Sequence, residues 1–176
     1  MKKILIFGGS GFLGNTIFKE LNPFFDLYCT YFRNNLYKKN KRFYYFDIRQ
    51  NPTIILKKIK PNIIISTVSG DFYNQISFHD EIIKHCETKT IKFLFISSSN
   101  VFDFFTNFPS YEDDKTFSDS IYGKVKINIE NKILRSNIKN WAILRSPMIF
   151  DFNSPRIVEL KKKLSEKDPI EIFPNL

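Results

Sequence analysis

The sequence is poor in the residues on which several classes of protein depend. It has two cysteines, Cys29 and Cys86, with no C-x-x-C pair, so we expect neither a disulfide framework nor a cysteine metal site, and we expect a reducing compartment. Its two histidines, His79 and His85, stand six residues apart and share no helix face, so no metal site is predicted from them. No apolar run approaches the roughly eighteen residues that cross a membrane, and the short run after Met1 ends at a glycine cluster. The sequence therefore predicts a cytoplasmic protein without a signal peptide or a membrane contact.

What remains is the composition of a packed globular domain with a surplus of positive charge. Hydrophobic residues make up 43% of the 176 residues, with 20 phenylalanines, which is enough for one core. The formal net charge of +9 raises the question of nucleic-acid binding. However, the densest basic run, residues 33–42, lacks the repeated aromatic residues of a surface on which bases stack. We therefore expect the lysines to lie on solvated surfaces and do not predict a nucleic-acid partner.

Short apolar runs alternate with amphipathic segments along the chain. The runs predict strands at residues 3–7, 27–32, 43–46, 62–66, 92–97 and 141–145, and the segments between them predict helices near 13–21, 52–59, 74–87 and 120–136. Apolar strands separated by helices are typical of a parallel sheet covered on both faces. The predicted fold is therefore α/β, a Rossmann-type doubly wound parallel sheet with strand order 3-2-1-4-5-6. We assign residues 1–150 to this domain and 151–176 to a truncated or minimal substrate-binding extension, with a helix at 156–164 and a short strand at 169–173.

A glycine-rich turn follows the first predicted strand and opens the first helix. In F-G-G-S-G-F-L-G the spaced glycines are Gly8, Gly11 and Gly14. Gly8 allows the tight turn, Gly11 lets backbone amides approach a pyrophosphate, and Gly14 lets the helix pack on the strand. The helix N-terminus adds partial positive charge for the phosphates. Because the turn lies between a strand and a helix, it predicts a dinucleotide cofactor.

The residue at the end of the second strand distinguishes the two nicotinamide cofactors. An acidic residue there holds the ribose 2′-hydroxyl of NAD, whereas a basic one accommodates the 2′-phosphate of NADP. Here the strand ends in Arg33 with no acid nearby, which favours NADP(H) over NAD(H), although Arg33 as part of a merely basic loop stays an open alternative. Asp47 follows the third strand, where a carboxylate could reach the adenine amino group or could cap a helix or turn.

Five motifs occur in the order found in one enzyme family. They are G-G-S-G-F-L-G, F-D-I, I-S-S-S-N-V-F-D, Y-G-K-V-K-I-N-I-E and I-L-R-S, and the resemblance that they carry runs from Met1 to about Ile172. In this order they resemble the extended short-chain dehydrogenases/reductases. V-F-D followed by Glu112 and Asp114 looks most like the dTDP-4-dehydrorhamnose reductases, whereas the related epimerases and dehydratases more often carry V-Y-G there. The resemblance implies an oxidoreductase that makes sugars for cell-surface polysaccharides, and it adds to the cofactor site Phe12, Leu13, Ile48 and Ser66.

The resemblance also implies a catalytic triad at Ser98, Tyr122 and Lys126. A tyrosine with a pKa of about 10 is a weak proton donor at neutral pH, and a lysine four residues on lies on the same helix face, where its charge lowers that pKa. Tyr122 is then the acid, Lys126 keeps it acidic and binds the cofactor ribose, and Ser98 orients the substrate carbonyl. Which of Ser97, Ser98 and Ser99 faces the cleft stays open, because side chains alternate along a strand.

The chain departs from the resembling reductases at four places. Ser99 and Asn100 stand where those enzymes have Asp-Tyr, S-T-V-S replaces Asn-Ala-Ala after the fourth strand, and the loop that follows is short. Residues 151–176 supply only the start of the family's substrate domain. Asn74 matches either the family's relay asparagine or a helix-start residue.

Three hypotheses follow for the function. The first is an NAD(P)H-dependent reductase of a nucleotide-linked 4-keto-6-deoxy sugar, similar to dTDP-4-dehydrorhamnose reductase. The second is a nucleotide-sugar epimerase or dehydratase that uses the same triad. The third is a non-catalytic NADP-binding protein or fragment. A nucleotide sugar is the expected substrate, and the choice between a homodimer and a partner subunit stays open.

Overall fold

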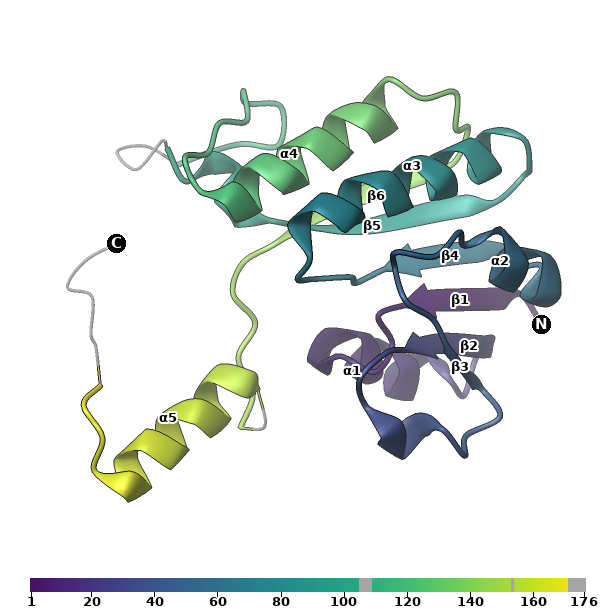
Figure 1. Ribbon diagram of the computed structural model, residues 1–176. Coiled ribbons are helices and arrows are strands. Elements are labelled where there is room, and N and C mark those ends of the chain that lie inside the picture. The colour runs from purple at the N-terminus through teal and green to yellow at the C-terminus, as the bar shows by residue number, and fades with distance from the viewer. Residues whose placement is uncertain (105–108, 153, 171–176) are drawn as a thin grey trace.

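The structure is a computed structural model that describes residues 1–104, 109–152 and 154–170. At its centre lies a sheet of parallel strands in the order β3-β2-β1-β4-β5-β6 (Figure 1). The strands are β1 (Lys3–Phe7), β2 (Asp26–Tyr31), β3 (Phe43–Tyr45), β4 (Ile63–Ser66), β5 (Lys92–Ser98) and β6 (Trp141–Ser146). This confirms the predicted doubly wound fold and its strand order.

Helices connect the strands and cover the sheet, and a fifth helix follows the last strand. They are α1 (Phe12–Leu21), α2 (Thr53–Ile59), α3 (Phe72–Glu87), α4 (Ile121–Leu134) and α5 (Pro155–Glu166), with short 3₁₀ turns η1 (Asn35–Tyr37) and η2 (Ser99–Phe102). The chain moves outward from β1 to β2 and β3, then returns to β4 on the other side of β1. In sheets of this kind, ligands bind where the strand order reverses, outside the carboxyl ends of the strands. We call that edge, where the strands end, the carboxyl edge.

Alternating side chains on each strand build two apolar clusters, one on each face of the sheet. Leu5 and Phe7 point to the face covered by α2, α3 and α4, and that cluster includes Ile55, Phe78, Ile82, Phe93, Phe95, Ile129 and Ile133. Ile4 and Ile6 point to the opposite face, where α1 packs through Ile17, Phe18 and Leu21. The two faces explain why the strands read as continuous apolar runs, since both sets of alternate residues are buried.

The segment after β6 leads away from the sheet. Residues 147–154 connect β6 to α5, and α5 lies beyond the carboxyl edge, apart from the sheet (Figure 1). No residue of α5 is buried. The helix predicted at 156–164 is therefore present and slightly longer, whereas most of the strand predicted at 169–173 falls outside the described residues.

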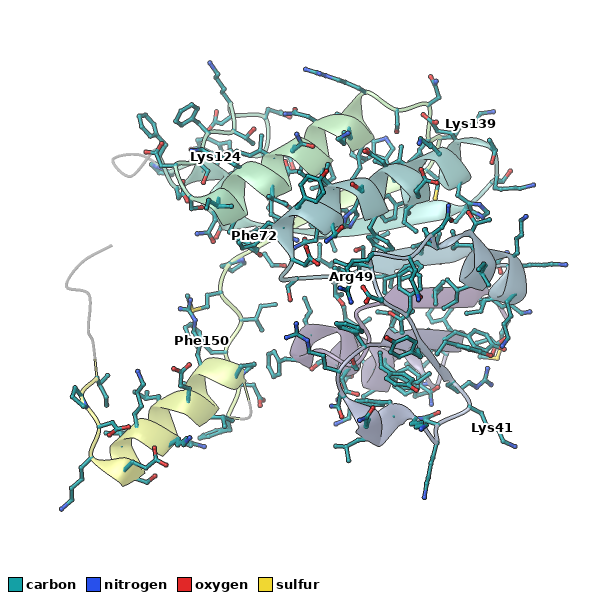
Figure 2. The ribbon with its side chains drawn as sticks, in the orientation of Figure 1. Lys41, Arg49, Phe72, Lys124, Lys139 and Phe150 are labelled. Carbon is teal, nitrogen blue, oxygen red and sulfur yellow. The ribbon has the colours of Figure 1, made fainter. Side chains whose placement is uncertain are left out.

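Most lysines lie on the surface of the molecule, and the two cysteines lie in its interior. Lys41, Lys124 and Lys139 project from different sides of the molecule, so their charge is dispersed over its surface (Figure 2). Cys29 and Cys86 are buried free thiols. Among the described residues, no helix has the length and apolar character that a membrane crossing requires, and no group of three or more metal-ligating side chains gathers.

Candidate functional site

The glycine turn between β1 and α1 has the geometry that its sequence predicts. Gly8 has a φ of +83°, a conformation that side chains other than glycine rarely adopt. Its carbonyl accepts a hydrogen bond from the Gly11 amide at 2.9 Å. A Cβ added at Gly14 would lie 2.4 Å from the same carbonyl oxygen, so α1 packs directly against the turn. Gly11 is exposed at the start of α1, although its own amide is already bonded to the Gly8 carbonyl.

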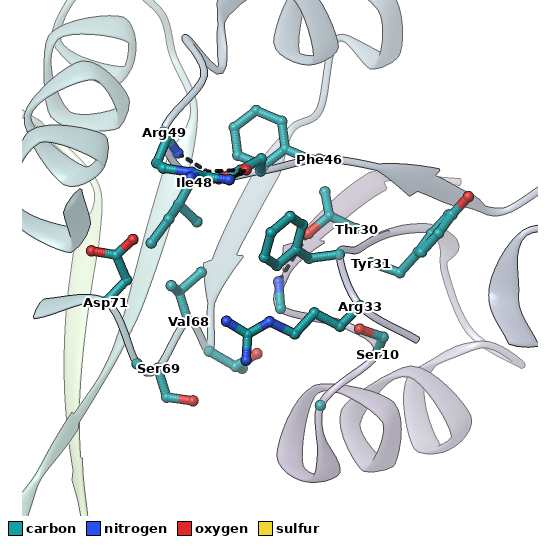
Figure 3. A pocket seen from close by; sticks show the side chains of 16 residues that line it. Ser10, Thr30, Tyr31, Arg33, Phe46, Ile48, Arg49, Val68, Ser69 and Asp71 are labelled. Carbon is teal, nitrogen blue, oxygen red and sulfur yellow. Dashed lines mark hydrogen bonds and ion pairs between the residues drawn. The ribbon is translucent and has the colours of Figure 1, made fainter. Parts of the chain in front are cut away.

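A pocket of about 400 Å³ opens at the carboxyl edge beside this turn. Its walls come from the glycine turn, the end of β2, the residues after β3 and the residues after β4 (Figure 3). The lining residues are Gly8, Ser10, Gly11, Thr30, Tyr31, Phe32, Arg33, Phe46, Asp47, Ile48, Arg49, Thr67, Val68, Ser69, Gly70 and Asp71. The pocket therefore lies at the switch point of the sheet, where the fold favours a ligand.

Two arginines and a phenylalanine form one side of the pocket. The Arg33 side chain reaches across it toward Val68 and Ser69 (Figure 3). The guanidinium carbons of Arg33 and Arg49 lie 5.6 and 5.9 Å from the centroid of the Phe32 ring. An aromatic face steadies both cations by its quadrupole, and their charge makes this side of the pocket attractive to an anion.

Asp47 lies in the pocket but is already paired. It is 6% exposed, and Arg49 donates to its carboxylate from the backbone at 3.0 Å and from Nε at 3.0 and 2.9 Å. These hydrogen bonds from Arg49, together with the charge of Arg33, hold the pKa of Asp47 below its usual range. A group that uses Asp47 as an acceptor must share it with Arg49. Sequence reasoning missed Arg49, although an aspartate side chain commonly accepts from the backbone amide two residues on, as Asp47 does here.

The other residues expected at the cofactor site divide into two groups. Gly8, Gly11, Arg33, Asp47 and Ile48 line the pocket. The rest do not: Phe12, Leu13, Gly14, Ser66 and Lys126. Phe12 and Leu13 are half-buried in α1.

Ser66 turns into the interior at the end of β4. Its hydroxyl lies 2.9 Å from Nε2 of the fully buried His79. The His79 Nδ1–H donates to the Gln75 carbonyl, so Nε2 is left to accept from Ser66. Thr67, the next residue, lines the pocket in its place.

Tyr122 and Lys126 lie on the first turns of α4. The helix is capped by Ser120, whose hydroxyl accepts from the Gly123 amide at 3.0 Å. Lys126 is 3% exposed; its Nζ donates to the Ile96 carbonyl at 3.1 Å and lies 5.6 Å from the Tyr122 ring centroid. Burial lowers the pKa of Lys126 to about 8, against the attraction of Glu130, which raises it. The structure thus brings the lysine under the tyrosine ring.

Ser98 is tied to the same turn of α4 through η2. Its hydroxyl donates to Asn100 Oδ1 at 2.8 Å and accepts from the Asn100 amide at 3.2 Å. A Cβ added at Gly123 would lie 2.7 Å from the Asn100 carbonyl oxygen, so η2 and α4 are in close contact. Ser97 instead donates to buried Glu130, and Ser99 is exposed at the start of η2. Ser98 is the serine at the carboxyl edge that is joined to the Tyr122 turn.

An aromatic contact joins the pocket to Tyr122. Gly70 and Asp71 line the pocket with positive φ of 74° and 40°, and Asp71 caps α3 by accepting from Asn74. The next residue, Phe72, lies 6.2 Å from Tyr122 between ring centroids. The pocket and the Tyr122 turn are therefore neighbours on one edge of the sheet, and Asn74 serves as the first-turn partner of the α3 cap.

A doubly wound sheet, a glycine turn at its switch point and a Tyr-x-x-x-Lys helix beside it define the extended short-chain dehydrogenase/reductase type. A model of the family described as "RmlD substrate binding domain" matches residues 72–174, more than half of the chain, and the protein belongs to that family.

Three proteins of similar sequence or fold are longer than this chain. The methionine adenosyltransferase 2 subunit beta of Xenopus tropicalis is 25% identical over 166 residues, which are 85% of this chain and 47% of that protein. A hypothetical dTDP-4-dehydrorhamnose reductase from Sulfolobus tokodaii superposes with a TM-score of 0.79 at 20% identity, over 96% of this chain and 63% of that one. UDP-glucuronic acid 4-epimerase from Bacillus cereus, solved with NAD, gives 0.73 at 21% identity, over 98% and 66%. The chain spans about half to two thirds of these proteins.

Proposed function

We propose that the protein is an NADP(H)-dependent reductase of a nucleotide-linked keto sugar, with dTDP-4-keto-6-deoxy sugars as the substrate class. The observation that carries this proposal is the continuity of the carboxyl edge. The pocket beside the glycine turn extends to Asp71, and the following Phe72 contacts Tyr122. A reductase needs its cofactor and its proton donor at the same carbonyl, and the pocket lies next to a tyrosine–lysine pair, which supports this assignment.

The residues at the pocket fit a dinucleotide phosphate. Gly11 leaves the backbone at the start of α1 open, and the helix N-terminus favours an anion there. Arg33 would pair with the 2′-phosphate of NADP, and Asp47 would accept from the adenine amino group while keeping Arg49 as its partner. When bound, NADPH supplies the hydride. The chain supplies the remaining groups.

Tyr122 is proposed to give its phenolic proton to the carbonyl oxygen of the substrate, which becomes the alcohol. Lys126 stabilises the phenolate that remains, because a positive charge beside the ring favours the ionised form. Ser98 donates a hydrogen bond to the same oxygen and holds it in place. To do so its hydroxyl must turn from Asn100, the residue it contacts in the structure.

Two other functions remain candidates on specific observations. UDP-glucuronic acid 4-epimerase, a neighbour in fold, is an epimerase solved with NAD, and an epimerase would use the same edge. A non-catalytic subunit is favoured by the similarity to a protein named as a subunit. The V-F-D motif at residues 101–103 and Arg33 are the features that favour the NADP-dependent reductase.

Replacement of Tyr122 by phenylalanine tests the proposal. Tyr122→Phe removes the proton donor and little contact area, so NADPH oxidation with dTDP-4-keto-6-deoxy sugars should fall by about a hundredfold or more, with NADPH affinity nearly unchanged. Tyr111→Phe is the matched control, because Tyr111 is 72% exposed and stands outside the pocket. Oxidation is followed at the nicotinamide absorbance band.

The unmodified protein decides between the candidates. If the protein binds NADPH but does not oxidise it with any keto sugar of a panel, the reductase proposal is wrong. The non-catalytic subunit is then the function that remains. If the protein converts a UDP-sugar to its epimer without net consumption of NADPH, the epimerase stands instead. Equal turnover by Tyr122→Phe and the unmodified protein would show that Tyr122 is not the acid.

A further inference from the structure

Lys126 is a cationic side chain held inside the protein. It is 3% exposed, its Nζ has one hydrogen bond to the Ile96 carbonyl at 3.1 Å, and it lies 4.8 Å from the centroid of the Phe95 ring. A buried ammonium group loses its proton unless an opposite charge or enough acceptors compensate for the lost water. One carbonyl and two aromatic faces do not replace a hydration shell. The charge of Lys126 therefore depends on its neighbours.

The titratable groups around Lys126 come from three elements. From α3, His79 packs edge-on against the same Phe95 ring at 5.0 Å, and burial lowers the pKa of His79 to about 3, so it is neutral at ordinary pH. From α4 itself come Tyr122, one turn before, and Glu130, one turn after. From β6, Arg145 reaches Glu130. Among these described neighbours, Glu130 is the carboxylate, and its attraction raises the pKa of Lys126.

The Glu130 carboxylate is itself fixed in the interior. It is 2% exposed and accepts from Nη2 of Arg145 at 2.9 Å and from Nε at 3.2 and 3.3 Å. The Ser97 hydroxyl donates to its Oε1. Arg145 also donates to the Glu112 carbonyl at 2.6 Å, which ties this cluster to the loop before α4. Glu130 therefore cannot swing away from the helix face that it shares with Lys126.

We propose that Glu130 is a positioning residue for the Tyr122–Lys126 pair, and that its buried carboxylate is the counter-charge that keeps Lys126 protonated. The role in proton transfer rests on the proposed function. The protonation of Lys126 does not, because it follows from burial and charge alone. Along two turns of α4, the Glu130 carboxylate then keeps Lys126 charged, and the charge of Lys126 stabilises the phenolate of Tyr122.

The direction in which Glu130→Gln changes the protonation midpoint of Lys126 distinguishes an electrostatic role of Glu130 from a structural one. Glu130→Gln keeps the size of the side chain and removes its charge. The pH at which Lys126 is half protonated should then fall by about one pH unit, because burial is no longer opposed. Loosened packing would do the reverse, since water reaching Lys126 favours the charged form.

The protonation of Lys126 can be measured without a substrate. In protein labelled with ¹³C-lysine, the Cε resonance of Lys126 is followed from pH 6 to 11 by NMR and assigned by its loss in Lys126→Arg. Glu81→Gln is the control, because Glu81 pairs with Lys84 at 2.8 Å on the surface of α3. Its removal should leave Lys126 unchanged. An unchanged or raised midpoint in Glu130→Gln overturns the proposal.

A second variant keeps the test decisive if Glu130→Gln does not fold. Glu130→Gln with Arg145→Gln leaves neither charge of the pair unmatched. Because loss of the Arg145 cation favours protonated Lys126, the midpoint should fall there by less than in the single variant, and it should still fall because Glu130 is the charge that raises the pKa of Lys126. If the chain proves active, the alkaline limb of its pH–rate profile should move to lower pH in step with the NMR midpoint. If no keto sugar is reduced, the proposed function fails while the titration still decides the role of Glu130.

Discussion

The proposed preference for NADP(H) rests on a single charge in the pocket, that of Arg33. Arg33 reaches into the pocket, whereas the other arginine there, Arg49, is bonded to Asp47 (Figure 3). Arg33→Ala should weaken NADPH binding roughly tenfold to a hundredfold, the value of one charge-assisted pair, and should leave NADH binding unchanged. Lys38→Ala is the control, because Lys38 belongs to the same basic run but does not line the pocket. Both affinities are measured by nicotinamide fluorescence titration; equal affinities in the unmodified protein would contradict the preference.

At this scale the sequence predicts positions better than contacts. Gly8, Gly14 and Arg33 could be placed because a strand–turn–helix motif fixes their backbone positions. The partner of Ser66 could not, because His79 comes from the second turn of α3 and the pairing depends on how that helix packs on β4. The same reason hides the Arg145–Glu130 pair, which joins a strand to a helix. Long-range side-chain pairs depend on packing, and no local pattern encodes packing.

Among the elements, α4 has a first turn that several side-chain hydrogen bonds hold in place. Ser120 caps it, and the Asp103 carboxylate accepts from Ser118 and Ser120 at 2.8 and 3.0 Å. Ser120→Ala removes the bond to the Gly123 amide and should lower the free energy of unfolding by about 1 kcal/mol. Ser154 is a matched control, because it also stands at a helix N-cap but its hydroxyl makes no capping bond.

Urea denaturation of both variants measures the difference. Ser154→Ala should leave the midpoint nearly unchanged, since none of the described residues hydrogen-bonds to its buried hydroxyl. Equal losses in the two variants would mean that the Ser120 bond adds nothing beyond the general preference for serine at a helix start. An unchanged midpoint in Ser120→Ala would show that the hydrogen bond from Ser120 to Asp103 does not stabilise the fold either.

The strands could be predicted because each is a continuous run of apolar residues. All six strands begin and end within about two residues of the apolar runs, because parallel strands covered on both faces are apolar throughout. The start of α3 was less predictable. It begins at Phe72 rather than near 74, because Asp71 adopts a left-handed conformation and caps the helix from there. A non-glycine residue in that conformation is uncommon, and the sequence around Asp71 does not predict it.

For the whole molecule, a buried histidine sets the response to acid. His79 is fully buried between α3 and the sheet, and its pKa is lowered to about 3 by burial. In the unfolded chain it binds a proton near pH 6.5. Between these values the unfolded state binds more protons than the folded state, so the free energy of unfolding falls as the pH falls. The contribution is fully present above pH 6.5 and is lost progressively toward pH 3.

Urea denaturation at pH 6.5 and pH 5 tests this dependence. The free energy of unfolding should drop by roughly 2 kcal/mol over that interval, before the carboxylates begin to titrate. His79→Gln should remove most of the drop, whatever its stability at pH 6.5. His85→Gln should keep most of it, because His85 is only half-buried and burial lowers its pKa less than that of His79. A drop that persists in His79→Gln would place the acid sensitivity elsewhere, and the Ser66–His79–Gln75 contacts would then be structural without governing the pH range in which the fold survives.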